Sequence, residues 1–221
     1  YILKPQTKIY ANLPEIEDLT MHLAELSKLK TVEHSLIRLK SGQLAYITKR
    51  IDRNKESKLH MEDMCQITER LTEHKYNGSY EQIAKAIKKY SSNSGLNVID
   101  FFELVLFSFL TGNNDMHLKN FSMIQKDGKW VLSPGYDLLN VNLANPSDHE
   151  ELALNMEGKK RKFTRHHFER FGTNLGLNNK QVQGVFDRFL KKQPKAKSLI
   201  EESFLSQEAT VPSSIVSLSL G

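Results

Sequence analysis

The segment from Val98 to Gly112, VIDFFELVLFSFLTG, constrains the fold more than any other part of the sequence. Its apolar residues fall on nearly every side of a helix, so this helix has no face to present to water and must lie in the centre of a globular domain. The apolar run is roughly 13 residues long, whereas a bilayer-spanning helix needs ~20. Gly112 is a natural helix stop. The sequence therefore predicts a buried helix that leads directly into the polar stretch NNDMHLKN.

The length and composition are those of a globular protein with room for a cleft. A chain of 221 residues can bury one sizeable core or two modest lobes. Hydrophobic residues make up 39% and charged residues 26%, which excludes a fibrous or disordered chain. With 31 Lys and Arg against 26 Asp and Glu, the net charge of +5 allows mild attraction to nucleotides and other polyanions.

Cysteine usage and the absence of a leader indicate the compartment. Cys65 is the single cysteine, which excludes an internal disulfide framework and fits a reducing environment. No basic-then-apolar leader and no bilayer-spanning run are present in the sequence. We therefore expect a cytoplasmic protein without a membrane segment. The chain opens at Tyr1 without an initiator Met and already within a strand, so we also expect further residues upstream.

The first third of the chain predicts a small α+β lobe. YILKP, residues 1–5, is a short apolar strand ended by a proline. Apolar residues recur at helical spacing from about 15 to 29. SLIRLKSGQLAYITKRI, residues 35–51, alternates around a Ser-Gly pair and predicts a β-hairpin. We assign this lobe to residues 1–52, incomplete at its N-terminus.

The remainder, residues 53–221, predicts a larger, mainly helical lobe that begins after a charged loop at 51–58. FSMI and WVLSP flank an Asp-Gly pair and predict a second hairpin. The Ser-rich residues 210–221 predict a frayed tail. Further helices are predicted, besides the central one, at 60–71, 79–91, 163–175, 179–192 and 196–205.

Asp115 and Asn120 follow the central helix in the pattern D-x-x-x-x-N. In protein kinases this spacing supplies a carboxylate that orients the acceptor hydroxyl and an amide that holds a metal ion. A neutral oxygen ligand binds Mg²⁺ without adding charge against the phosphates. Asp137 comes after the predicted hairpin, where kinases place the aspartate that carries Mg²⁺. The three residues predict a phosphoryl-transfer site.

A lysine and a glutamate of the small lobe complete the predicted nucleotide site. Lys4 lies at the end of the first strand and can supply a cation for the α and β phosphates. Glu17 is the glutamate best placed on the following helix to hold that lysine. Each feature alone is common in proteins, but their order along the chain matches the requirements of a kinase.

The segments GNNDMHLKNFS and SPGYDLL resemble the catalytic segment of the HipA-type serine/threonine kinases, the toxins of bacterial toxin-antitoxin systems. The family pattern is GN-x-D-x-H-x-KN-[FY]-S and then P-x-YD-[LV]. Further segments agree in order: YILKP with the nucleotide lysine strand, EDLTMHLA with the small-lobe helix, KRIDR with the inter-lobe connection and HMEDMCQ with the following helix. The resemblance covers about residues 1–141.

The resemblance implies a protein-kinase-like two-lobed fold, with ATP and Mg²⁺ as the nucleotide and its metal. It assigns nucleotide phosphate binding to Lys4, catalysis to Asp115, and metal binding to Asn120 and Asp137.

The resemblance also extends to the loop and to the connection between the lobes. Within the catalytic loop we expect a structural role for His117 and electrostatic support of the transferring phosphoryl group by Lys119. The backbone from Lys49 to Ile51 would hold the adenine ring. The family's Glu-Arg-Phe-Asp-Arg reads Lys-Arg-Ile-Asp-Arg here, a departure that affects nucleotide affinity more than activity, since backbone groups make the contacts.

The resemblance also implies partners. We expect transfer to a serine or threonine of a protein substrate, such as an aminoacyl-tRNA synthetase, together with a DNA-binding antitoxin and a role in bacterial persistence. The family's Gly-rich phosphate loop, with its regulatory serine, and its additional N-terminal subdomain would precede residue 1. A missing segment or a separate chain would supply them.

Two other functions fit the same residues. A small-molecule or lipid kinase shares the Asp, Asn and Asp arrangement, and a narrow acidic acceptor pocket would favour it over a protein kinase. A kinase-like binding module with an inactive site is the third hypothesis, because the Gly-rich loop is not in the sequence. Calorimetry with ATP and Mg²⁺ separates that hypothesis from the first two.

Overall fold

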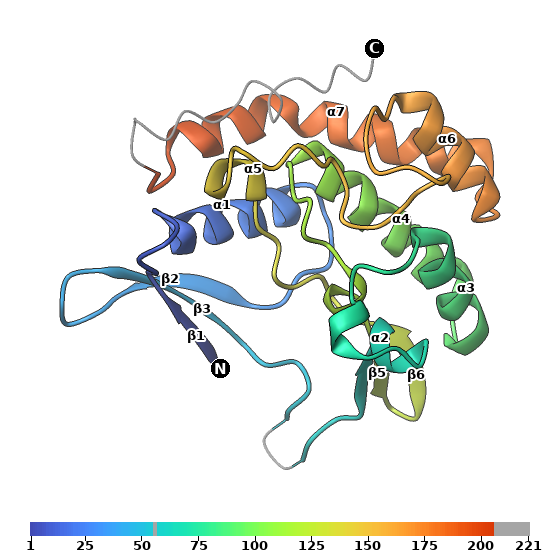
Figure 1. Cartoon of the computed structure of the whole chain (residues 1–221), viewed down its shortest axis with the longest axis horizontal. Coiled ribbons are helices and arrows are strands. Elements are labelled where there is room, and N and C mark those ends of the chain that lie inside the picture. The colour runs from blue at the N-terminus through green and yellow to red at the C-terminus, as the bar shows by residue number, and fades with distance from the viewer. Residues whose placement is uncertain (55–56, 206–221) are drawn as a thin grey trace.

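The computed structural model describes residues 1–54 and 57–205. The fold is α+β, as predicted: two small antiparallel sheets and a set of helices share one hydrophobic core (Figure 1). No described helix has both the length and the hydropathy that crossing a bilayer requires. The predicted frayed tail at 210–221 lies outside the described residues.

The first sheet contains strands β1 (Ile2–Pro5), β2 (His34–Arg38) and β3 (Leu44–Thr48), in the antiparallel order β1-β3-β2. The predicted first strand and hairpin are therefore confirmed. Helix α1 (Leu13–Leu26) packs on this sheet. It begins two residues earlier than predicted, because Pro14 in its first turn is pre-organised for a helix start.

The second sheet contains β4 (Met61–Asp63), β5 (Ser122–Lys126) and β6 (Lys129–Leu132), in the order β4-β5-β6. The predicted hairpin is confirmed: β5 and β6 are joined at Asp127 and Gly128, which both have positive φ.

The predicted helix at 60–71 was wrong. Residues 61–63 pair with β5 instead, and only a four-residue helix, α2 (Met64–Ile67), follows. Asp63 ends the strand and caps this helix by accepting a hydrogen bond of 3.0 Å from the Gln66 backbone. As a strand, residues 61–63 gain backbone hydrogen bonds to β5. These bonds outweigh the preference for a helix that the spacing of the apolar residues predicts.

Most predicted helices are present. They are α3 (Tyr80–Tyr90), the central α4 (Ser94–Leu110), α6 (Arg165–Asn174) and α7 (Asn179–Glu201). The shorter elements are the 3-10 turns Thr72–His74 and Leu118–Asn120 and helix α5 (Val141–Ala144).

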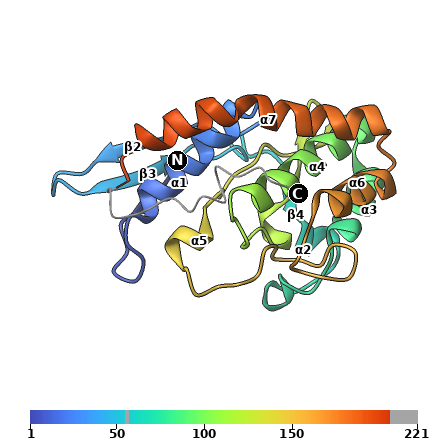
Figure 2. The same cartoon turned by 90° about the horizontal axis from the view of Figure 1, so that it is seen from above.

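The prediction of two helices after residue 179 was wrong, since α7 continues through Pro194. A proline inside a helix removes the hydrogen bond to the carbonyl four residues earlier. Pro194 and Leu190 are both exposed, so water can solvate the free carbonyl and the helix is not broken. In Figure 2 the helix runs along most of the length of the molecule, and the β2–β3 hairpin extends beyond its end.

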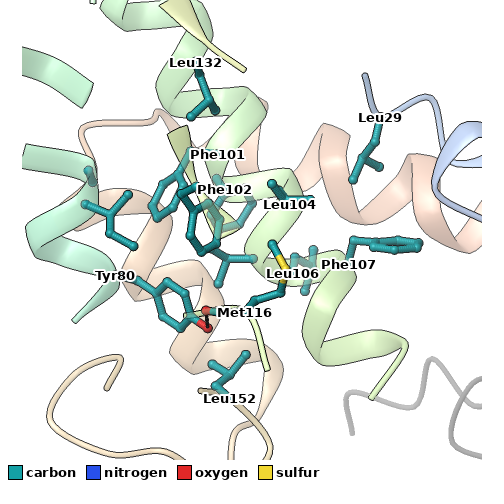
Figure 3. Packing of buried hydrophobic residues seen from close by; sticks show 14 of the residues in the cluster. Leu29, Tyr80, Phe101, Phe102, Leu104, Leu106, Phe107, Met116, Leu132 and Leu152 are labelled. Carbon is teal, nitrogen blue, oxygen red and sulfur yellow. Dashed lines mark hydrogen bonds between the residues drawn. The ribbon is translucent and has the colours of Figure 1, made fainter. Parts of the chain in front are cut away.

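The core forms around α4, as its sequence predicts. Phe101, Phe102 and Leu106 are fully buried and face Tyr80 of α3 and Met116 of the loop after α4 (Figure 3). The Tyr80 hydroxyl donates a hydrogen bond of 3.1 Å to the Met116 carbonyl, so its one polar group is satisfied. Burying each large side chain contributes about 2 kcal/mol, so this packing holds α4 in place. The start of the loop after α4 is thereby held in place as well.

Two backbone contacts tie the segment that follows α1 to the segment that follows β6. The Gly135 backbone N–H donates 2.8 Å to the Lys30 carbonyl, and the Val32 N–H donates 3.1 Å to the Gly135 carbonyl. On the other side, the Asn140 N–H donates 3.1 Å to the buried Thr20 hydroxyl. The residues between 135 and 140 therefore lie beside α1, although more than 100 residues separate them in the sequence. The predicted division of the chain at residue 52 stays a prediction.

Candidate active site

Lys4, Glu17 and Asp137 meet at one point. The Lys4 ammonium donates a hydrogen bond of 2.7 Å to Glu17 Oε1 and a second, shorter one to Asp137 Oδ1. Strand β1 places Lys4 opposite Tyr46 of β3, and its ammonium lies 5.8 Å from the Tyr46 ring centroid. The structure thus brings together three residues that the sequence proposed for the nucleotide site.

Burial controls the charges at this point. Glu17 is only 4% exposed, and desolvation raises its pKa to about 7 in spite of the nearby Lys4 ammonium. Burial lowers the pKa of Lys4, but the carboxylates of Glu17 and Asp137 together raise it more, so Lys4 stays protonated. Asp137 is more exposed, at 46% of its side chain, and has φ of 58°, a left-handed conformation that aspartate tolerates.

The loop after α4 presents Asp115 and Asn120. A carboxylate oxygen of Asp115 accepts a hydrogen bond of 2.5 Å from the hydroxyl of Tyr76. The buried Asn120 amide nitrogen donates 3.2 Å to the Asp115 carbonyl, which fixes the side chain and leaves its amide oxygen as a neutral ligand. The loop is further held by the Leu118 N–H, which donates 3.1 Å to the Lys75 carbonyl.

Tyr136 joins this loop to the Asp137 segment. Its hydroxyl donates 2.9 Å to the Lys119 carbonyl and lies 2.6 Å from the Ser122 hydroxyl. The loop after α4 and Asp137 are therefore fixed relative to one another by side-chain hydrogen bonds as well as by the hairpin between them.

Lys119 and His117 have different environments. The Lys119 ammonium donates 2.7 Å to Asp63 Oδ2, and this hydrogen bond raises its pKa. His117 is buried, its ring packs edge-on against Tyr76 at 5.0 Å, and burial lowers its pKa. A neutral, buried imidazole fits the structural role predicted for His117. Burial lowers the pKa of His117 more than the negative charges of Asp115 and Asp137 raise it.

A cleft of about 440 Å³ opens beside these residues. Lys4, Asp137 and Lys119 line it, as do Lys49 and Ile51. Asp115 faces a neighbouring cavity of about 540 Å³, which Tyr76, Asp148 and Glu150 also line. The arrangement has one compartment next to Lys4 and Asp137 and another next to Asp115.

The predicted adenine-binding segment lies on the wall of the first cleft. The Lys49 N–H already donates 2.9 Å to the Glu33 carbonyl, and its ammonium bonds the Glu33 carboxylate at 2.6 Å. The backbone N–H of Lys49 is therefore already used by the Glu33 carbonyl, so it is not available to a nucleotide. The residues from Arg50 to Asp52 also line the cleft, so a backbone contact from this segment would fall there.

Sequence reasoning missed Tyr76, Asp63 and Tyr136. Asp63 was overlooked because it fell within the helix predicted at 60–71. Tyr76 was overlooked because it lies in a segment without a periodic pattern of apolar residues. Tyr136 had a signal, because it forms part of the P-x-YD-[LV] pattern directly before Asp137. Its bond to the Lys119 carbonyl explains why a tyrosine suits that position.

The chain matches curated proteins named as kinases. It is 28% identical over 236 residues to a Haemophilus influenzae protein named "Putative kinase", covering 94% of this chain and 69% of the relative. It is 34% identical over 154 residues to "Putative kinase Y4dM" of Sinorhizobium fredii, covering 64% of this chain and 37% of the relative.

Solved structures share the fold. HipA of Shewanella oneidensis, in a complex with HipB and operator DNA, superimposes with a TM-score of 0.81 at 20% identity over 94% of this chain. The chain spans 53% of that protein's length. The Helicobacter pylori proinflammatory kinase CtkA gives a TM-score of 0.67 at 18% identity, covering 95% of this chain and 79% of that kinase.

A family model covers nearly the whole described chain. The model for the HipA-like C-terminal domain matches residues 1–197, a range that contains Lys4, Glu17, Asp115, Asn120 and Asp137. This match agrees with the resemblance drawn from the sequence motifs. The chain belongs to the family of HipA-like C-terminal domains.

Proposed function

We propose that the chain is the catalytic part of an ATP-dependent serine/threonine protein kinase with a two-lobed, protein-kinase-like fold. The observation that carries the proposal is the contact of Lys4 with both Glu17 and Asp137. Kinases need a lysine held by a helix glutamate next to the aspartate that carries the metal. Family membership and the kinase names of its relatives support the same reaction class.

Asp137, beside Lys4, and Asn120, in the loop after α4, carry the kinds of donor that fit Mg²⁺. Asp137 offers an exposed carboxylate, and Asn120 an amide oxygen whose orientation is fixed by the bond from its nitrogen to the Asp115 carbonyl. Mg²⁺ prefers such oxygen ligands and keeps several waters. The Lys4 ammonium already bonds the Asp137 carboxylate, so this position attracts positive charge. When bound, Mg²⁺ would neutralise charge that develops on the β and γ phosphates.

The residues of the chain would then divide the work. Lys4, held by Glu17, would bind the phosphates of ATP in the 440 Å³ cleft. Asp115 would orient the acceptor hydroxyl and accept its proton as its oxygen bonds the γ-phosphorus, while the bond from that phosphorus to the β,γ-bridging oxygen breaks and ADP leaves. Lys119, which lines the same cleft, would stabilise the transferring phosphoryl group.

The cavity beside Asp115 would receive the acceptor. Asp148 and Glu150 also line it, so its rim is acidic, although Glu150 is paired with Lys160 at 3.2 Å. This acidity is the specific observation that favours a second candidate, a kinase for small cationic hydroxyl compounds such as aminoglycosides. Phosphorylation of an aminoglycoside, with no transfer to any protein, would establish this alternative.

We further propose the cellular context implied by the family. The Shewanella HipA structure contains HipB and operator DNA, which supports a DNA-binding antitoxin as a partner here. An aminoacyl-tRNA synthetase is the proposed protein substrate, and the cytoplasm the proposed compartment. The chain spans about half of that HipA, so a Gly-rich loop and an N-terminal subdomain would come from another segment or chain.

Replacing Asp115 with Asn tests the proposal. We expect the rate of phosphoryl transfer to fall at least ~100-fold, because the carboxylate acts on the acceptor hydroxyl during the transfer step. Calorimetry with ATP and Mg²⁺ should give nearly the wild-type affinity, since Asp115 lies outside the nucleotide cleft. Unchanged transfer would refute the assignment. Absence of ATP binding by the wild-type protein would instead favour an inactive binding module.

A further inference from the structure

A second group of ionisable side chains lies where helix α1 packs on strand β2. Asp18 and His22 are one turn apart on α1, and His34 is the first residue of β2. One ligand atom from each residue can be chosen so that all three lie within 4.8 Å of one another. None of the three takes part in the kinase reaction proposed above.

The cluster contains buried polar atoms without hydrogen-bond partners. The His34 side chain is 0% exposed, and neither of its ring nitrogens makes a hydrogen bond of good geometry with any described residue, although carboxylate oxygens lie 3.4 and 3.5 Å away. The buried Asp18 Oδ1 likewise makes none. A buried donor or acceptor left unpaired is costly and usually has an explanation such as a bound ion. His34 also packs against Tyr46 at 5.8 Å, so its ring is held in place.

The distances suit a metal with short bonds. His34 Nδ1 lies 3.5 Å from Asp18 Oδ1, and His22 Nε2 lies 3.6 Å from Asp18 Oδ2. Zinc–nitrogen and zinc–oxygen bonds of about 2.1 Å place tetrahedral ligand atoms about 3.4 Å apart. An ion could therefore be accommodated by small side-chain rotations, with no change in the path of the backbone.

Glu25 supports both histidines from the other side. The second ring nitrogen of His22 lies 3.2 Å from one Glu25 carboxylate oxygen, and that of His34 lies 3.4 Å from the other oxygen. Histidines that bind metals usually donate their second N–H to a carboxylate, which fixes the tautomer and the ring orientation. Each histidine here thus faces Asp18 with one nitrogen and Glu25 with the other.

We propose that Asp18, His22 and His34 bind one divalent transition-metal ion of the zinc class, with Glu25 orienting both imidazoles. Two imidazoles and a carboxylate favour zinc or cobalt over Mg²⁺, which prefers oxygen ligands. His22 is 44% exposed, so an ion can enter from solvent, and water can take a fourth position. The ion would cross-link α1 to β2 and so hold the helix that carries Glu17.

The test is titration of tag-free, EDTA-treated protein with Co²⁺, followed by competition with Zn²⁺. We expect one equivalent per chain, d–d absorption that Zn²⁺ abolishes, and no displacement by excess Mg²⁺. His22→Gln and His34→Gln should each weaken binding at least tenfold. His166→Gln is the matched control, because His166 lies 4.0 Å from Glu169 three residues later on a helix but belongs to no group of three possible metal ligands in the described part of the chain.

Further measurements keep the result decisive if His34→Gln fails to fold. His22 is exposed enough for its variant to fold, which circular dichroism would verify. Zn²⁺ should raise the unfolding midpoint of the wild type and not that of His22→Gln. Wild-type protein that binds neither Co²⁺ nor Zn²⁺, or His22→Gln that binds them as the wild type does, overturns the proposal. So does binding that Asp137→Asn removes and His22→Gln retains.

Discussion

The Tyr76 hydroxyl donates a hydrogen bond of 2.5 Å to the carboxylate of Asp115, which lies 39 residues further along the chain. The carboxylate proposed to orient the acceptor is thus already occupied by a phenol. Tyr76 also packs against His117, so the ring and the hydroxyl make separate contacts. An acceptor hydroxyl must either share Asp115 with this phenol or displace it.

Tyr76→Phe should therefore improve binding of the acceptor. The substitution keeps the ring contact with His117 and removes the competing donor, and a hydrogen bond to a charged group contributes about 1.5–3 kcal/mol at most. We expect the KM for an acceptor protein to fall several-fold with the KM for ATP unchanged. Steady-state kinetics with each substrate varied in turn would measure this. A higher acceptor KM would mean that Tyr76 binds the acceptor itself.

Glu17 should make nucleotide binding depend on pH. Its pKa is about 7, so it takes up a proton as the pH falls through neutrality and its ion pair with Lys4 is lost. Affinity for ATP, measured by calorimetry, should decrease from pH 8 to pH 6. Glu17→Gln should bind weakly at both pH values. Any pH dependence that remains in this variant belongs to the nucleotide or to other groups.

The same carboxyl should lower stability as the pH rises. Because the folded pKa of about 7 exceeds the ordinary glutamate pKa of 4.5, the folded state binds more protons than the unfolded state between these values. The Glu17 contribution to the free energy of unfolding should fall across this window, by on the order of 3 kcal/mol. Urea unfolding at several pH values would detect it. An identical slope in Glu17→Gln would assign the effect to another residue.

Lys119 and Asp63 can be separated by a pair of variants. Lys119→Met removes the cation that lines the cleft, and we expect kcat to fall about 10-fold or more with little change in ATP affinity. Asp63→Asn keeps Lys119 and weakens the bond that holds it, so its effect on kcat should be smaller. Thermal unfolding of both proteins controls for the role of Asp63 as the cap of α2. Equal losses of kcat in the two variants would indicate that Lys119 and Asp63 form a purely structural ion pair.

Gly112 should resist substitution more than other left-handed glycines. Its φ is 64°, and an added Cβ would lie 2.6 Å from the Asn142 side-chain nitrogen. Gly158 has φ of 78° with open space around it, so Gly158→Ala measures the backbone penalty alone, ~1–2 kcal/mol. Gly112→Ala should cost more than this, as measured by urea unfolding. Equal losses in the two variants would show that Asn142 moves aside freely.

Local patterns allowed much of the fold to be predicted. The hairpins were predicted from the alternation of apolar and polar residues and from turn residues such as Asp127-Gly128. The central helix was predicted from its long apolar run. Each of these patterns lies entirely within the segment that it describes. The helix predicted at 60–71 failed because a partner strand from 122–124 decided its backbone. The break predicted before residue 196 failed because Pro194 faces solvent.

The candidate site was predictable where motifs are contiguous. Asp115, Asn120 and Asp137 could be found from spacing and family pattern, and Lys4 and Glu17 from their elements, although their roles stay predictions. The bond between Tyr76 and Asp115 could not, because it depends on how the segment before α3 packs on the loop after α4. The Asp18 and His22 pair had a signal in its i,i+4 spacing, but His34 joins it only when α1 lies on β2.

Helix α7 also limits how the molecule can deform. Its first half packs beside α6 and its second half reaches α1, so one helix connects α6 to the helix that carries Glu17 (Figure 2). A movement of α1 relative to α6 would bend α7, and the turn at Pro194 lacks one of the hydrogen bonds that resist bending. The stiffness of this one solvent-facing turn would then limit how far α1 can move relative to α6.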